Sequence, residues 1–430
     1  MTKVIIATSK NDCEHLLGKF LDESHYDTLI QEDTDCYLYS EEEGNIAFKF
    51  RKNYFKQSEQ DSAYAGLREA AVQTQNRGLA AGPKGDKCGN RDWVSEFQLR
   101  AIDFLKKEEK NTVVEVDLKK DIENLRERYE KENSSRGLVW LSAKVKEDGF
   151  DFEEWLSRVS KLPIEKRKEE ALGVEETYIS DTTYANVVFS GLAGWFDRYP
   201  RIPYGRATAY TENHYDKFKL AFPFLQSLDR GFAELLPTRH AAQREAADMV
   251  DPGFLVPGTV FTTITVNKTF RTAAHRDAGD FSNGLSNLLV LSNNGNYTGG
   301  YLILPEVRIA VDVRPGDLLL VNNHEYIHGN TPIELQDETA ERISLVCYLR
   351  EKMLELGDDA FENLRYDFVE SRRKNKEHPM QRRLWNGISE GMWESDEWYD
   401  YAEKKGGNTM RWGKYDKKRE KISTIDNLFA

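Results

Sequence analysis

Cysteine is scarce in this chain, and its scarcity excludes two kinds of scaffold. The 430 residues include only Cys13, Cys36, Cys88 and Cys347, with no C-x-x-C pair and no zinc-like spacing. Such scattered cysteines argue against a disulfide framework and against a structural zinc site. We therefore expect a protein of a reducing compartment.

Long hydrophobic runs are also missing. No stretch approaches the ~18 consecutive apolar residues that a membrane-spanning helix needs. The opening residues 1–8 contain an apolar run that is too short for a signal peptide, and they predict a first β-strand instead. The expectation is a soluble cytoplasmic protein with no membrane partner.

Positive charge is in deficit as well. Lys and Arg number 60 against 73 Asp and Glu, which gives a net charge of −13. A generally basic nucleic-acid-binding protein is thereby disfavoured, because phosphate contacts require Lys and Arg. Any nucleic-acid site in this chain must be a local basic patch. The apolar content of 39% is sufficient for a proper core.

The chain divides by pattern into three parts, and together they predict an α+β fold. Residues 1–180 are expected to form an α+β scaffold, with a strand at 46–51 after a turn at 41–45 and charged amphipathic helices over 91–172. Residues 181–350 are richest in short β-like runs divided by Gly, Asn, Pro and Asp. Residues 351–430 form a helical extension, whose expected role is scaffolding, with an interaction surface as the alternative.

The chemistry centres on His275 and Asp277. On an extended segment residues i and i+2 leave the same face, so this pair supplies two thirds of a facial metal site. The third ligand should be an imidazole from a distant strand, because two His and one carboxylate leave three positions open on a ferrous ion. His328, after the apolar run 318–321, meets this need. His324 follows the same strand and is the alternative ligand.

Arg342 and Ser344 open the next apolar run and suggest the co-substrate. A buried guanidinium with a neighbouring hydroxyl can hold the far carboxylate of a dicarboxylate in a bidentate way, which points to 2-oxoglutarate. Each motif alone has an ordinary explanation, such as a chance H-x-D pair or a solvated arginine. Their order along the chain, with Gly299-Gly300 between them, makes coincidence a poor explanation.

Two stretches place arginine where nucleic acid could bind. One interleaves arginines with Tyr and Pro, which suits phosphate pairing and base stacking: Arg198, Arg201 and Arg206. The other is rich in Gly and Ala, so that backbone can approach a ligand closely: Arg68, Arg77, Lys84 and Lys87. The alternative for the first stretch is a loop packed over the mouth of the β-structure, with Arg201 and Arg206 in structural ion pairs. The alternative for the second stretch is an ordinary surface loop.

At these residues the sequence resembles the 2-oxoglutarate/Fe(II) dioxygenase superfamily. The stretches 261–267, 271–277 and 296–305 are similar to the TET and J-binding protein branch, which oxidises the 5-methyl group of pyrimidines in nucleic acid. Residues 187–244 resemble phage-encoded members, for which the compartment would be the host cytoplasm. The resemblance implies a double-stranded β-helix (jelly-roll) core at 181–350, with the metal at its open end.

The resemblance also implies roles for single residues. His275, Asp277 and His328 would bind Fe(II), and Arg271 would join Arg342 and Ser344 in contacting 2-oxoglutarate. The position of Arg271 is displaced by about one residue from that of the corresponding arginine in relatives. Molecular oxygen would be the second co-substrate.

The substrate expected from the resemblance is DNA, contacted through Asp280, Arg201 and Arg206. The base is 5-methylcytosine as first choice and thymine as second, since a carboxylate at Asp280 can accept a hydrogen bond from either. Asp280 could instead be a turn residue that caps the next segment. Two other functional classes stay open: a hydroxylase of a protein side chain or small molecule, which the acidic charge favours, and a binding module without iron.

Overall fold

The computed structural model describes residues 2–74, 77–83, 154, 186–199, 202–375, 378, 392–393 and 395–405. The helices expected over 91–172 lie outside this range, apart from Glu154. Within it, no helix combines the length and the apolar character needed to cross a membrane.

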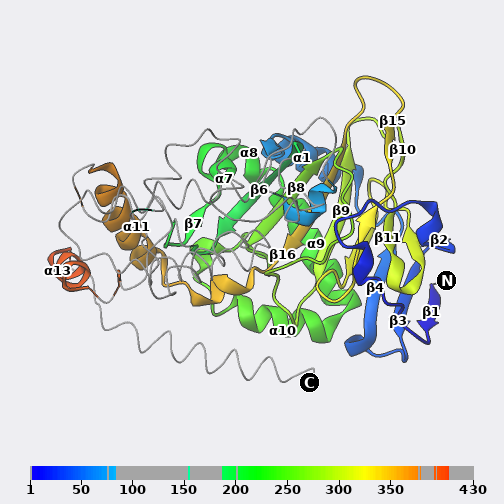
Figure 1. Ribbon diagram of the computed structural model, residues 1–430, viewed down its shortest axis with the longest axis horizontal. Coiled ribbons are helices and arrows are strands. Elements are labelled where there is room, and N and C mark those ends of the chain that lie inside the picture. The colour runs from blue at the N-terminus through cyan, green and yellow to red at the C-terminus, as the bar shows by residue number, and fades with distance from the viewer. Residues whose placement is uncertain are drawn as a thin grey trace.

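Among these residues, ten strands form one large sheet (Figure 1). Its order is β1 (Lys3–Ala7), β3 (Thr34–Leu38), β4 (Ile46–Arg51), β13 (Leu318–Val321), β9 (Ser286–Ser292), β16 (Arg342–Tyr348), β8 (Thr263–Lys268), β6 (Val188–Phe196) and β5 (Gln73–Thr74), with β7 (Arg206–Ala207) also paired to β6. Only the β1–β3 pairing in this sheet is parallel. The strands predicted at the chain start and at 46–51 are confirmed.

A second sheet faces part of the first. It has the order β14 (Gly329–Asn330), β11 (Leu302–Leu304), β12 (Ile309–Val311) and β2 (Thr28–Ile30), and a separate hairpin joins β10 (Tyr297–Gly299) to β15 (Ile333–Leu335). The predicted α+β class, with large antiparallel sheets, agrees with this architecture.

Helices cover the face of the large sheet that points away from the second sheet. They are α1 (Gln57–Leu67), α7 (Ala209–Asn213), α8 (Tyr215–Lys219), α9 (Phe222–Leu235) and α10 (Pro237–Ala247). Pro223 lies in the first turn of α9, where its missing N–H is not needed for a helical hydrogen bond.

The large sheet is buried on both faces, because alternate side chains along its strands point to opposite sides and both sides are covered. On β9, Leu289 and Leu291 pack against the helices, whereas Leu288 and Val290 point toward the second sheet. All four are at most 6% exposed. The molecule is therefore layered as helices, large sheet and small sheet, and its two apolar cores lie between these layers.

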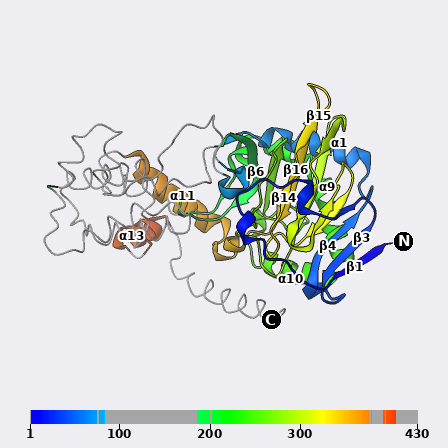
Figure 2. The same cartoon turned by 45° about the vertical axis from the view of Figure 1, so that its right-hand side comes forward.

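Strands from the beginning of the chain belong to both sheets. β4 pairs with β13, and β2 pairs with β12, so residues 28–51 extend the sheets built by residues 263–348 (Figure 2). Phe48 and Phe50 of β4 are fully buried between the two sheets. The division of the chain at residues 180 and 350 stays a prediction.

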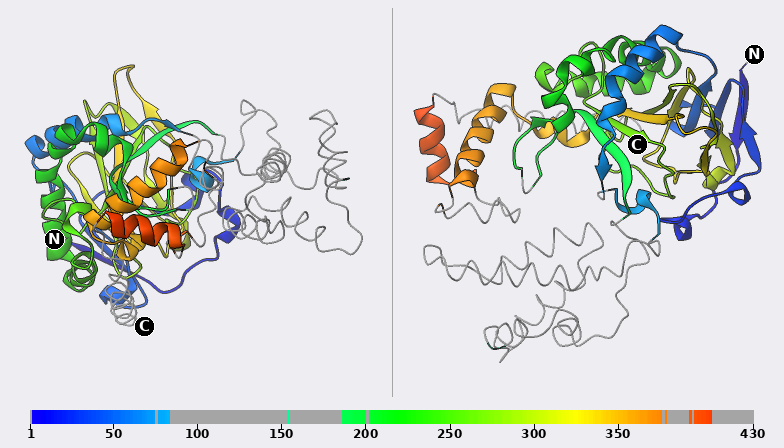
Figure 3. Two further views of the ribbon diagram at one scale, coloured as in Figure 1. Left: turned by 90° about the vertical axis from the view of Figure 1, so that its left-hand side faces the viewer. Right: turned by 90° about the horizontal axis from the view of Figure 1, so that it is seen from above.

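In the part of the chain that the structure describes, the last strand is followed by α11 (Asp359–Lys374) and α13 (Asp396–Lys404). They pack together through Phe361, Phe368 and Trp398, at the end of the molecule opposite β1 (Figures 1 and 3). The cluster also includes Tyr204, which ties this end to the segment after β6.

The burial of Phe48 generates a test of the role of the N-terminal strands. Replacing Phe48 by Ala should lower the free energy of unfolding by about 3–5 kcal/mol, because the cavity left between two sheets cannot collapse. Urea denaturation measures this loss. Val4→Ala on β1, a side chain 45% exposed, is the control and should cost far less. Equal losses would contradict the assignment of β4 to the core.

Candidate metal centre and its cavity

An antiparallel backbone bridge holds two histidines side by side. His275 lies in the segment after β8, and His328 immediately precedes β14. The N–H of each donates to the carbonyl oxygen of the other at 2.9 Å, and the imidazole centroids are 4.3 Å apart. Gly329 permits this close approach, because a Cβ there would lie 3.1 Å from backbone atoms of Ala273 and Ala274.

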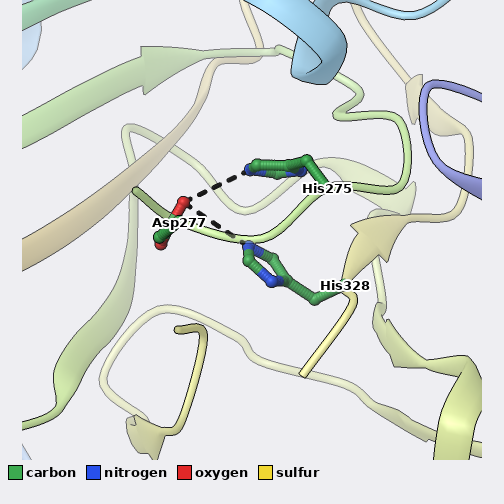
Figure 4. A group of neighbouring side chains, drawn as sticks. All are labelled: His275, Asp277 and His328. Atoms are coloured by element: carbon green, nitrogen blue, oxygen red, sulfur yellow. Dashed lines mark ion pairs between the residues drawn. The ribbon is translucent and has the colours of Figure 1, made fainter. Parts of the chain in front are cut away.

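Asp277 completes the group (Figure 4). Its Oδ1 lies 3.4 Å from Nε2 of His275 and 3.8 Å from Nε2 of His328. One ligand atom from each of the three residues falls within 4.8 Å of the others. Two imidazoles and one carboxylate converging in this way match the facial triad of non-haem iron sites.

The surroundings of the triad fix its orientation. Nδ1 of His275 is 2.8 Å from the carbonyl of Ala273, and Nδ1 of His328 is 3.1 Å from that of Tyr326. Both Nε2 atoms therefore point toward the shared centre. The amide of Asn323 donates to the other carboxylate oxygen of Asp277 at 3.1 Å. Such partners hold metal ligands in their productive geometry.

The protonation of the three side chains suits metal binding. Burial raises the pKa of Asp277, but the neighbouring imidazoles and the Asn323 hydrogen bond outweigh this and bring it to about 2. Burial, together with the nearby His275, lowers the pKa of His328 to about 4. Burial also lowers the pKa of His275, yet the Asp277 carboxylate produces a net increase. The site thus presents an ionised carboxylate and a neutral His328 at pH 7.

Arg342 lies in the same cavity as a buried guanidinium that lacks an acidic partner among the described residues. It is 2% exposed, its Nη2 donates to the carbonyl of Gly300 at 3.1 Å, and its Nε has no hydrogen-bond partner. Burial lowers its pKa. Gly300 has φ of 73°, and a Cβ there would come within 2.9 Å of the Arg342 Nε. Asp312 and Tyr297 lie close enough to raise the pKa of Arg342, but no described carboxylate forms an ion pair with it, so this buried cation favours an anionic ligand.

A cavity of about 970 Å³ joins the triad to Arg342. Alternate residues of β16 and its continuation line it: Arg342, Ser344, Val346, Tyr348 and Arg350. Tyr348 and Arg350 were not among the predicted site residues, although the two-residue period beginning at Arg342 points to both. Arg77, from the glycine-rich segment, also lines the cavity.

Of the remaining predicted site residues, some line the cavity and others do not. Arg206 and Asp280 line the cavity, and Asp280 is 6% exposed. Burial and the negative charge of Asp277 raise the pKa of Asp280 to about 8. Arg271 is not brought to the cavity: its Nη2 donates to the carbonyl of Leu21 at 2.7 Å, and its guanidinium stacks on Phe20. Arg201 lies outside the described residues.

The geometry distinguishes the two candidate third ligands, since His324 is exposed and is not part of the cluster. His328→Ala should therefore weaken binding of Mn²⁺, a stand-in for Fe(II), by roughly a hundredfold, in line with the loss of a direct ligand. Titration calorimetry measures the affinity. His324→Ala is the matched control and should bind Mn²⁺ as the unaltered protein does; the reverse result would exclude this triad.

Comparison with known proteins agrees with these features. Residues 198–351 match the family described as the oxygenase domain of the 2OGFeDO superfamily, Tet_JBP. The chain is 38% identical over 164 residues to "Bifunctional helicase and thymine dioxygenase JBP2" of Trypanosoma brucei brucei, covering 37% of this chain and 15% of that protein. It is 35% identical over 167 residues to "Thymine dioxygenase JBP1" of Crithidia fasciculata, covering 37% and 20% respectively.

Among solved structures, "NgTET1 in complex with 5mC DNA" is similar at 13% identity and a TM-score of 0.38, covering 82% of this chain and 83% of that one. The two thymine dioxygenases named above, by contrast, are matched over only 15% and 20% of their own length. Fe(II) and 2-oxoglutarate are the cofactor and co-substrate that the family implies, and the triad and the unpaired Arg342 fit both. Through residues 198–351 the chain is therefore similar to the Tet_JBP oxygenases of the 2-oxoglutarate/Fe(II) dioxygenase superfamily.

Proposed function

We propose that this protein oxidises the 5-methyl group of a pyrimidine base in DNA, using Fe(II), 2-oxoglutarate and oxygen. The observation that carries the proposal is the cavity that holds the His275, Asp277 and His328 cluster together with the unpaired guanidinium of Arg342. Iron and 2-oxoglutarate supply the oxidation of an unreactive C–H bond by oxygen.

The residues of the chain divide the cavity into two ends. Arg342 and Ser344 lie at the beginning of β16 and would hold the far carboxylate of 2-oxoglutarate. Asp280 and Arg350 lie beyond the triad and would face the substrate. His328 is buried, whereas the side chains of His275 and Asp277 are 16% and 22% exposed, so the triad can be reached from the cavity.

A local basic patch distinguishes a DNA substrate from a metabolite or a protein side chain. Although the protein carries a net charge of −13, the described cavity lining includes five arginines: Arg77, Arg206, Arg276, Arg342 and Arg350. Arg276 is paired with Glu14 and Glu306, so it does not contribute free charge. Arg350 is paired with Asp197, and Arg342 is buried at the co-substrate end, so Arg77 and Arg206 are the lining arginines that remain to contribute cationic surface for phosphates.

We further infer that the two facing sheets are the walls of a double-stranded β-helix. The sheets enclose one apolar core, and the triad lies where β14 of one sheet meets the segment that follows β8 of the other. In such a fold the metal ligands would lie at an open end.

The proposal includes two candidate substrate bases, 5-methylcytosine and thymine. The sequence resemblance puts 5-methylcytosine first, whereas the curated relatives named above are called thymine dioxygenases, which favours thymine. Asp280 can form a hydrogen bond with either base, so both belong in the assay.

The assignment of Arg342 can be tested by binding alone. Arg342→Lys should weaken binding of 2-oxoglutarate in the presence of Mn²⁺ by about 30-fold, because a bidentate charge-assisted pair is lost at a cost of about 2 kcal/mol. Titration calorimetry gives the affinity. Arg308→Lys, on the surface and paired with Asp27, is the control. Unchanged binding in Arg342→Lys would remove Arg342 from the co-substrate site.

The activity itself is tested by mass spectrometry of nucleosides. DNA containing 5-methylcytosine, or ordinary thymine DNA, is incubated with protein, Fe(II), 2-oxoglutarate and ascorbate. We expect one base to gain one oxygen, and we expect this product to be absent with His275→Ala. Succinate formed without any change in either base would leave the oxygenase intact and reject DNA, and would direct the search to protein and metabolite substrates.

A further inference from the structure

Helix α11 lies beyond the matched oxygenase segment, yet one of its side chains is buried against that segment. Glu362, in the first turn of α11, is 1% exposed. Its carboxylate accepts hydrogen bonds from the backbone N–H of Gly205 at 2.6 Å and of Gly357 at 2.8 Å. It also accepts a forked pair of bonds from the guanidinium of Arg198. Burial raises the pKa of Glu362, but Arg198 more than offsets this and keeps the carboxylate ionised.

The residue before Arg198 leads into the cavity. Asp197 is 1% exposed, and its carboxylate forms an ion pair with Nε of Arg350. The backbone carbonyl of Asp197 accepts a hydrogen bond from Nη1 of Arg206 at 3.2 Å. Two consecutive residues thus connect helix α11 on one side with two cavity arginines on the other.

Those two arginines form one wall of the cavity. The guanidinium of Arg350 lies 4.0 Å from the ring centroid of Phe196, and that of Arg206 lies 5.3 Å from it. All three side chains line the cavity. We call this group, Phe196, Arg206 and Arg350, the arginine wall. It leaves Nη atoms of two cations available to a phosphate or to an oxygen of a base.

The arginine wall is distant from the co-substrate end. Along the extended chain from Arg342 to Arg350, each residue advances the backbone by ~3.3 Å, so the two arginines are separated by roughly 25 Å of chain. A change confined to the wall should therefore alter substrate binding and leave 2-oxoglutarate binding unchanged.

We propose that Glu362 is a positioning residue for the substrate: through Arg198 and Asp197 it fixes the arginine wall, so that a helix outside the matched oxygenase segment controls affinity for DNA. This inference rests on the proposed function for the identity of the ligand, but the contacts themselves are independent of it.

The test compares Glu362→Gln with Asp367→Asn. Both remove one carboxylate charge from α11, but Asp367 is exposed. We expect Glu362→Gln to raise the KM for the oxidised DNA about tenfold, since small displacements of binding groups are costly. We expect kcat and the Kd for 2-oxoglutarate with Mn²⁺ to stay within about twofold of the unaltered protein, because the co-substrate end is not displaced. Asp367→Asn should change none of these quantities. An unchanged KM, or a parallel loss of 2-oxoglutarate binding, would overturn the proposal.

Two further measurements keep the test decisive. Arg198→Lys retains the positive charge opposite Glu362 but loses one of the two hydrogen bonds that the guanidinium donates to it. It should therefore raise the KM for DNA by a smaller factor than Glu362→Gln does. If Glu362→Gln fails to fold, Arg198→Lys takes its place in the test. Hydrogen exchange in residues 202–206 reports the contacts without any substrate. Faster exchange there in Glu362→Gln, but not in Asp367→Asn, supports the positioning role even if DNA proves not to be the substrate, and unchanged exchange rejects it.

Discussion

The antiparallel bridge between His275 and His328 is the contact on which the site depends. It joins two segments far apart in the chain by a reciprocal pair of backbone hydrogen bonds. The neighbouring Ala273 and Ala274 donate in turn to the carbonyls of Ala80 and Lys19, so N-terminal segments support the bridge from the other side. The metal ligands are thus held by backbone rather than by side-chain packing alone, which gives the precision that a three-ligand site needs.

Charge is distributed unevenly between the protein as a whole and the lining of the cavity. The protein as a whole is acidic, while the cavity collects guanidinium groups. Some of these cations are compensated, as Arg350 is by Asp197. Arg342 lacks an acidic partner within the described chain and is buried. Guanidinium groups gathered in a cavity of an acidic protein favour the binding of an anionic ligand there.

Local sequence patterns were sufficient to select four residues that the structure brings to one cavity: the H-x-D pair, His328 and Arg342. They could be selected from the sequence alone because metal and carboxylate binding restrict the residue types. Arg271 shows the limit of such reasoning: its place in the motif suggested a ligand contact, but stacking on Phe20 turns the side chain away. The pairing of β4 with β13 was equally hidden, since register between distant strands is set by packing and leaves no local signal.

The placement of β4 and β2 has a consequence for how the protein is made. At a synthesis rate of ~5–20 residues per second, β4 leaves the ribosome on the order of ten seconds to a minute before its partner β13, which begins at Leu318. During that interval Phe48 and Phe50 lack the strands that bury them. The nascent N-terminus therefore exposes an unpaired apolar strand edge, a template for aggregation.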